Sequence, residues 1–379
     1  MRSVLVGLVL IAAVLAGLWL GAESWAARRL AQQIAAHPDL SAQSVRPLRQ
    51  PDRIGLRLLA VAWSTGPGPG GAGAAVPAGD GPATEGVATD GVAGSGPALD
   101  LPALDLWVRP WSPLHGTAVL PDRARLRLNG RDRTLELQDS TAEIRLGASN
   151  GLAVAQIGLR SGPVRMDSAP LLGRADLHAQ MSALDFDAPK PARAAYRVRV
   201  DVADLQPDRL ADLGFAPSAL RGAASVQGQA QVWTDGVPRA GAPAPRLVGF
   251  QSQRLALRIG PIAAHLTGRI TRDAQGRAEG VVAIYTSDAA ELIAALAEAG
   301  VIPDDAVMLA TAMLRQVGSQ AMPDLDPDRP VAKASAVAAP PPSLTFPEPA
   351  EGELRLPLIL SGGQMMLGII PLGAAPRIF

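Results

Sequence analysis

Apolar and polar residues alternate with a period of two along most of the chain beyond residue 50. Segment 196–202 is the clearest example, because its apolar and charged side chains fall on opposite faces of an extended chain. The apolar set is Tyr196, Val198, Val200 and Val202, and the charged set is Arg197, Arg199 and Asp201. The same alternation recurs in 104–109, 225–233 and 353–360. It is typical of antiparallel strands with one face in water, so the sequence predicts a long antiparallel sheet.

Residues that favour tight turns separate several of these strands. Asn129 and Gly130 stand between two alternating segments, and Asp273 to Gly276 stand between two more. Asn-Gly suits a two-residue hairpin loop because both positions of the loop need positive φ. We therefore expect hairpins at both places.

One stretch near 287–318 has the pattern of helices instead. Ser287 and Asp288 can cap a run whose apolar residues recur at helical spacing, and Gly300 closes that run. A second helix is expected to begin at Pro303 and to end before Gly318. The sequence thus predicts a small helical hairpin.

The N-terminus contains a long apolar run. Val4 to Ala22 has no charged residue over 19 positions, and as a helix it would be about 28 Å long, close to the hydrocarbon thickness of a bilayer. We predict a single membrane anchor followed by an amphipathic exit helix, with the rest of the chain exported. The rival interpretation is a signal peptide cleaved after Ala26.

Composition shifts divide the chain further. We expect an anchor and exit helix over 1–37, a β-rich exported domain over 38–326 with a disordered insertion at 65–97, a Pro/Ala-rich tether over 327–350, and a C-terminal β-hairpin over 351–379 that completes the sheet. The predicted fold class is mainly β (β-rich α+β): a transmembrane helix, then a long antiparallel curved sheet with the small helical hairpin near 287–318.

Composition also limits the chemistry. Lys+Arg and Asp+Glu both number 35, so no basic face for nucleic acid is indicated. Without cysteine, thiolate catalysis and Cys-based metal sites are impossible. The histidines lie far apart with no carboxylate at metal-ligand spacing, and they are His37, His115, His178 and His265. We expect no catalytic residue, metal or cofactor.

Leu360 to Gln364 spells LSGGQ, the letters of the signature motif of ABC-type ATPases. That motif needs a Gly-Lys phosphate loop, and neither Lys190 nor Lys333 follows a glycine. Ser361, Gly362 and Gly363 are better explained as a structural β-turn between two apolar strands, so no nucleotide is expected. Pro357 cannot donate to a ladder, which predicts edge or irregular pairing in the first of these strands.

Three segments carry a family resemblance: LWVRPW at 106–111, the unit from Leu255 to Pro303, and the closing run from Gly362 to Ile378. Together they resemble an uncharacterised bacterial envelope family, domain of unknown function 2125 (DUF2125). The resemblance implies an envelope protein without an established activity, so it assigns no catalytic residue. With the anchor, it implies the bacterial inner membrane, a single N-terminal span and a periplasmic bulk.

Three functions fit this description. The first is a non-enzymatic envelope protein that presents an apolar sheet face or groove to lipid-like molecules or to an envelope partner, a plan similar to that of AsmA-like lipid-groove proteins. The second is a carboxylate-dependent hydrolase of envelope polymers, which would need two carboxyl groups about 5–9 Å apart in a cleft. The third is a purely structural scaffold with a filled core.

Overall fold

The computed structural model describes residues 23–32, 34–35, 39–50, 52–64, 97–128, 130–185, 187–212, 222–239, 242–298, 307–308, 311–312, 314, 322 and 344–377. The expected anchor from Val4 to Ala22 lies outside these residues. Among the described residues, no helix is long and apolar enough to cross a membrane.

The chain is mainly β, as predicted, and it divides into two compact units. Unit 1 comprises residues 1–143 and 164–170, and unit 2 comprises residues 144–163 and 171–379. The division falls inside the β-rich domain that we expected over 38–326. Two short strands, β7 (Thr141–Gly147) and β10 (Ala169–Leu172), contain residues of both units.

Unit 1 is built from antiparallel strands, some joined by hairpins and others brought together from farther apart in the chain. They are β1 (Leu40–Pro47), β2 (Ile54–Ser64), β3 (Ala98–Arg109), β4 (Ser112–Val119), β5 (Arg123–Leu128), β6 (Arg131–Leu137) and the short β9 (Val164–Met166). Residues 23–32 and 34–35 are helical. Ile34 from this helical segment packs with Leu58 and Val61 of β2 and Leu101 of β3. The helix thus supplies part of the core of unit 1.

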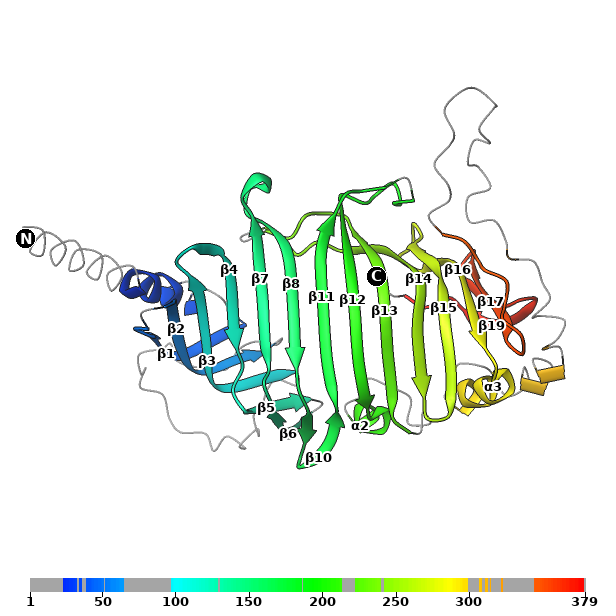
Figure 1. Ribbon diagram of the computed structural model, residues 1–379, viewed down its shortest axis with the longest axis horizontal. Helices are drawn as coiled ribbons and strands as arrows, with labels where there is room; N and C mark the ends of the chain where they lie inside the picture. The colour runs from blue at the N-terminus through cyan, green and yellow to red at the C-terminus, as the bar shows by residue number, and fades with distance from the viewer. Residues whose placement is uncertain are drawn as a thin grey trace, which may run out of the picture. The chain divides into compact units, whose positions relative to one another are not determined.

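Unit 2 is an open antiparallel sheet, and its strands follow one another in the order of the chain after β8 (Figure 1). They are β8 (Ala153–Ser161), β11 (Arg174–Ser182), β12 (Ala194–Leu205), β13 (Ala224–Thr234), β14 (Leu247–Ile259), β15 (Ile262–Arg272), β16 (Ala278–Thr286), β17 (Leu354–Ser361), β18 (Gln364–Leu367) and β19 (Ile370–Ala374). The 3-10 turn η2 (Ala148–Asn150) precedes β8, and the helix α2 (Pro207–Asp212) follows β12.

Both predicted hairpin turns are confirmed. Leu128 pairs with Arg131 across the Asn129-Gly130 loop, and Gly130 has a φ of 73°. At the other turn the Asp273 carboxylate accepts hydrogen bonds from the main-chain N–H groups of Gln275 (2.9 Å) and Arg277 (2.7 Å). An Asp that binds the main chain two residues further on is a common device for closing a turn.

The first helix of the predicted helical hairpin is α3 (Ala289–Glu298). Its Leu292 and Ile293 pack against Leu356 of β17 and Ile370 of β19. Of the second expected helix, only residues 307–308, 311–312 and 314 are described, and they are helical. In the chain, α3 stands between β16 and β17, and it covers this part of the sheet.

The expected insertion and tether lie mostly outside the described residues, which omit 65–96 and 323–343. Residues 344–350, the last part of the expected tether, are described as irregular chain in which Leu344 is buried.

Pro357 lies where the pairing of β17 changes. The proline pairs with Ala283 of β16 on one side, whereas the pairing of β17 with β18 begins only at Leu358. The main-chain oxygen of Pro357 accepts a hydrogen bond from the N–H of Gly368 in the turn after β18. The proline is therefore placed beside the end of a ladder, where its missing N–H costs no strand pairing.

Removing residues 351–379 should make the protein aggregate. The deletion takes away β17, β18 and β19, which exposes the hydrogen-bonding edge of β16 and uncovers Leu292 and Ile293 of α3. Light scattering during expression and refolding measures the effect. Deletion of 377–379 alone is the control and should leave the protein soluble. A soluble, cooperatively unfolding 1–350 chain would show that the C-terminal strands do not protect the sheet.

Candidate functional site

The strand register of unit 2 separates an apolar from a polar face. Directly paired residues of neighbouring antiparallel strands lie on the same face, so a row of paired residues can be followed across the sheet. One such row, here the first row, consists of Leu159, Leu177, Val200, Gly228, Leu255, Leu266, Ile284 and Leu356. Every side chain in it is aliphatic. We call this side of the unit 2 sheet the apolar face.

The opposite face carries hydrophilic side chains. One of its rows consists of Gln156, Gln180, Arg197, Gln231, Gln251 and Arg269. Another includes His178, Arg199, Gln229 and Arg254. The alternation seen in the sequence therefore persists across many strands, and we call this side the polar face.

A row of small residues runs along the apolar face beside the first row. This small-residue row contains Ala179, Val198, Ala230, Ser252 and Gly268 on consecutive strands from β11 to β15. On its far side lies a third row of larger side chains, Met181, Tyr196, Val232, Phe250 and Ile270. Adjacent rows are about 7 Å apart along a strand. The small-residue row is lower than both neighbouring rows at β11, β14 and β15, whereas at β12 Val198 equals Val200 in size and at β13 Gly228 of the first row is smaller than Ala230.

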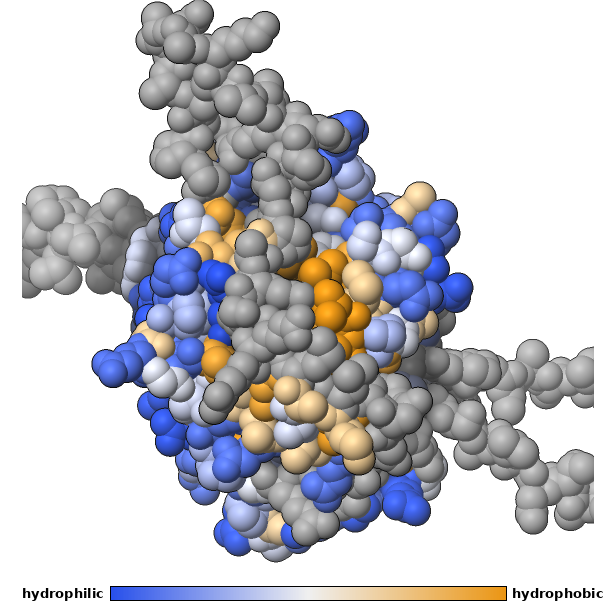
Figure 2. Space-filling model, turned by 90° about the vertical axis from the view of Figure 1, so that its right-hand side faces the viewer, coloured by the Kyte–Doolittle hydropathy of each residue, from blue (hydrophilic) through white to orange (hydrophobic). Residues whose placement is uncertain are grey.

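The apolar face is covered at one end and exposed toward the other. At the covered end Ile293 of α3 packs on Leu356, and both are 1% exposed. Leu177 and Val200 are half-buried, and at β8 Leu159 is 38% and Ile157 45% exposed. Figure 2 looks at the end with β16 to β19 and α3 and shows apolar residues gathered in its middle with hydrophilic residues on either side. The described residues of unit 2 thus leave part of an aliphatic surface in contact with water.

One polar group on the apolar face is firmly placed. The Tyr196 hydroxyl donates a 2.7 Å hydrogen bond to the main-chain oxygen of Val154 on β8. Burial raises the pKa of Tyr196, so the ring stays neutral at ordinary pH. Tyr196 therefore adds to the larger row without adding a charge.

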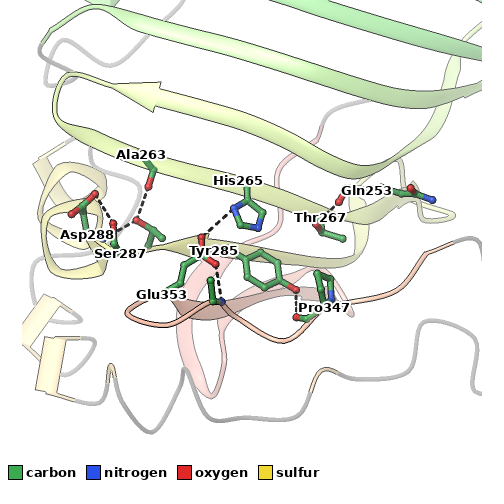
Figure 3. Close-up of polar contacts among 11 residues, drawn as sticks. Gln253, Ala263, His265, Thr267, Tyr285, Ser287, Asp288, Pro347 and Glu353 are labelled. Atoms are coloured by element: carbon green, nitrogen blue, oxygen red, sulfur yellow. Dashed lines mark hydrogen bonds and ion pairs between the residues drawn. The ribbon is translucent and has the colours of Figure 1, made fainter.

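A separate polar cluster lies on the other side of β15, β16 and β17 (Figure 3). The His265 ring stacks on the Tyr285 ring, with centroids 4.5 Å apart and an interplanar angle of 3°. His265 Nδ1 lies 3.3 Å from a Glu353 carboxylate oxygen. The Tyr285 hydroxyl donates to the main-chain oxygen of Pro347 at 2.9 Å, and Arg355 donates to the same oxygen at 3.3 Å. The cluster fastens residues 344–350 to the sheet.

The hydroxyl groups around this cluster are committed to the main chain. Thr267 donates to the oxygen of Gln253 at 2.6 Å, and Thr286 donates to the oxygen of Ala263 at 2.8 Å. Both threonines are 1% exposed. A hydroxyl that is buried and bonded in this way is not presented to a substrate, so the cluster is organised as a structural fastening.

Two of the expected isolated histidines do meet carboxylates. His115 lies 3.4 Å from Glu143, as His265 lies near Glu353, and in both pairs the partners come from different strands or segments. His37 lies outside the described residues. Within the described part of the chain, no group of three or more His, Asp or Glu side chains is arranged to hold a metal ion.

The LSGGQ stretch forms the hairpin between β17 and β18. Ser361 pairs with Gln364, and Gly362 and Gly363 are the two residues between them, with φ of 57° and 78°. Positive φ at both loop positions defines the turn that two-residue hairpins favour. A β-carbon on Gly363 would fall on the guanidinium of Arg277, which is 3.1 Å from Asp273 in the neighbouring β15–β16 turn.

These features define the class of protein: an antiparallel β-sheet protein with one partly uncovered aliphatic face. The family "Uncharacterized protein conserved in bacteria (DUF2125)" matches residues 82–376, so the chain belongs to that family. This agrees with the resemblance found in the sequence. Searches of curated proteins and of solved structures each gave no match.

Gly363→Ala should destabilise the protein more than Gly362→Ala. Both replacements place an L side chain at positive φ, which costs about 1–2 kcal/mol. Only at Gly363 does the new β-carbon also displace Arg277 from its position beside Asp273. Thermal unfolding measures the difference. Ser361→Ala is the control and should change stability little; equal losses at both glycines would contradict the role given to Arg277.

His265 should make the folded protein less stable as the pH falls. Burial lowers the pKa of His265 and Arg254 acts in the same direction, while Glu353 opposes them. The unfolded imidazole takes up its proton near pH 6.5, so the unfolded chain binds more protons than the folded one as pH drops through that range. The stability contributed by the neutral His265 side chain is present above the pKa that it has in the unfolded chain, and it is lost as the pH falls through the pKa that it has in the folded protein.

The test compares the unfolding free energy of the wild type and His265→Gln at about pH 8 and about pH 5. The difference in unfolding free energy between the two proteins at the higher pH measures the stability that is lost with the ring stacking. The variant should lose less stability on acidification than the wild type. A steeper loss in the variant would mean that the Glu353 contact, and not burial, dominates.

Proposed function

We propose that the protein is a membrane-anchored envelope protein whose apolar face binds lipid-like molecules by their hydrocarbon chains. The observation that carries the proposal is an apolar sheet face that the described residues leave partly uncovered and that carries a row of mostly small residues across five strands. A linear hydrocarbon chain has the shape of such a row. The function is binding or carriage, without a chemical step.

The dimensions of the face suit a chain-like ligand. The small-residue row crosses five strands, and strands lie about 4.8 Å apart, so the row is about 19 Å long. One leaflet makes up half of the hydrocarbon thickness of a bilayer, about 15 Å. An acyl chain that spans one leaflet would therefore fit along the row with room to spare.

The chemistry of the face also favours aliphatic ligands. Its central rows offer Leu, Val, Ala and Gly side chains and few polar atoms. Each CH₂ group removed from water contributes about 0.8 kcal/mol, and about half of that when only one side of the chain is covered. Ten or so groups would then contribute about 4 kcal/mol on the open face, before the cost of immobilisation.

Membrane attachment is part of the same proposal. The uncharged run from Val4 to Ala22 supports a single N-terminal span. The matching family is conserved in bacteria, so the proposed membrane is that of a bacterial envelope, with the bulk of the chain in the periplasm. A protein anchored in this way would stand at the source of its ligand. The polar cluster gives the hydrolase alternative no comparable support, because its Glu353 lies against His265 and the neighbouring Glu348 lies 4.0 Å from Arg355.

The test fills the small-residue row. Ala179→Trp with Ala230→Trp puts two large side chains into it, and Gln180→Trp with Gln229→Trp puts the same side chains on the polar face of the same two strands. Ala179 and Ala230 are half-buried, whereas Gln180 and Gln229 are exposed. The two pairs add the same side chains to the same strands, and they differ in the face that they change and in the residue that they replace.

Bound lipid is measured by mass spectrometry of the native protein after extraction in mild detergent, and by titration with a fluorescent fatty acid. Displacing about four CH₂ groups, at about 0.4 kcal/mol each on the open face, loses about 1.6 kcal/mol, so we expect about tenfold weaker binding for the alanine pair. The glutamine pair should bind like the wild type. A wild type that carries no lipid would support the scaffold alternative. Equal loss of lipid binding in both pairs would show that the apolar face is not the binding surface.

A further inference from the structure

Two exposed tryptophans belong to one end of unit 1. Trp111 is 73% exposed and stands in the turn between β3 and β4. Trp25 is 65% exposed and stands near the start of the helical segment that begins at residue 23. Large aromatic side chains with this exposure are unusual on a surface that faces only water.

A buried carboxylate holds the first described turn of this helical segment at this end; residues before 23 lie outside the described part of the chain. Glu23 is 0% exposed, and its oxygens accept hydrogen bonds from the main-chain N–H groups of Arg49 (3.2 Å) and Gly55 (3.0 Å). Gly55 pairs with Trp107 of β3, and that strand ends two residues later at Arg109. Glu23, in the first described turn of the helical segment, and the turn that contains Trp111 thus lie at the same end of β2 and β3.

The same end is rich in arginine. The Arg53 guanidinium lies 4.9 Å and that of Arg109 5.8 Å from the centre of the Trp107 ring. Arg49 belongs to the same end, because its main-chain N–H donates a hydrogen bond to Glu23. The carboxylates named at this end are Asp52, which lies 3.0 Å from Arg53, and the buried Glu23. Three arginines therefore stand against two carboxylates at the end of β2 and β3 that carries the Trp111 turn.

The chain that precedes Glu23 joins the protein at this place. It includes the uncharged run from Val4 to Ala22, the segment of the sequence best suited to hydrocarbon. Tryptophan is enriched where a membrane protein meets the boundary between headgroups and hydrocarbon, and arginine is attracted to anionic headgroups there. Three independent features, the exposed tryptophans, the arginines and the apolar run, therefore coincide.

We propose that this end of unit 1 rests on an anionic lipid surface, with Trp25 and Trp111 at the level of the headgroups. Arg49, Arg53 and Arg109 face the phosphates, and the Glu23 hydrogen bonds hold the helix so that both tryptophans reach the bilayer together. The contact sets how unit 1 stands on the membrane. It rests on the membrane anchoring proposed above and is independent of lipid binding by unit 2.

The absence of cysteine makes the test direct. Trp111→Cys carries a nitroxide spin label in the full chain, and Trp63→Cys is the matched control. Trp63 is 41% exposed on β2, eight residues from Gly55 and so about 26 Å away toward the other end of the strand. Both proteins are reconstituted in vesicles of equal parts phosphatidylcholine and phosphatidylglycerol, and vesicle flotation reports anchoring.

The label at residue 111 should be relaxed by oxygen dissolved in the lipid and lose its accessibility to a water-soluble nickel chelate, whereas the label at residue 63 should keep that accessibility. Vesicles of phosphatidylcholine alone should raise the nickel accessibility at 111. Equal nickel accessibility at both positions in floating protein overturns the proposal. Shielding of the label at 111 from both oxygen and the nickel chelate also overturns the proposal, because it indicates a protein contact. If the accessibility at 111 is the same with and without phosphatidylglycerol, the surface does not need to be anionic, and that part of the proposal is overturned.

Failure of the chain to float would overturn the anchoring together with this contact. The Ala179→Trp, Ala230→Trp pair separates the contact from the function of unit 2. In that background the label at 111 should keep its depth while lipid binding falls. A label that left the membrane in parallel with lost lipid binding would show that the apolar face, and not this end of unit 1, makes the membrane contact.

Discussion

The direct pairing of residues across antiparallel strands is the constraint on which unit 2 depends. Because paired residues share a face, an alternating strand can keep its apolar side only if its neighbour pairs in the matching register. Register shifts occur within the ladders, as between Gln229 and Ala230, yet the apolar rows continue on both sides of them. Both faces, and therefore the proposed binding surface, follow from that continuity.

The sequence predicted the elements whose signals are local. Alternation located strands such as β12 and β13, and the residues of the Asn129-Gly130 and Asp273 turns located hairpins. In the same way, a proline in β17 indicated that one of its ladders would stop nearby. These features need only the chemistry of a few consecutive residues.

The sequence could not predict what depends on residues far apart in the chain. The small-residue row combines single positions from five strands, and no local pattern marks Ala179, Ala230 or Gly268 as neighbours across the sheet. The stacking of His265 on Tyr285 beside Glu353 is equally invisible, because Glu353 is 88 positions from His265, counting from 265 to 353. The burial of Glu23 likewise depends on main-chain groups that β1 and β2 bring to the helix.

The hydrogen bond from Tyr285 to Pro347 has a consequence for how the protein can be engineered and how its gene can vary. It fixes the chain just before β17, while α3 is fixed by its own contacts with the sheet. Any length of chain between these two fixed points adds only slowly to the entropy of closing the loop, about 0.6 kcal/mol for each doubling. The stretch between Leu314, which still packs against the core cluster of α3, and Leu344 is thus a place where evolution can lengthen the gene, or where a fluorescent reporter domain can be inserted, without breaking the pairing of β16 with β17.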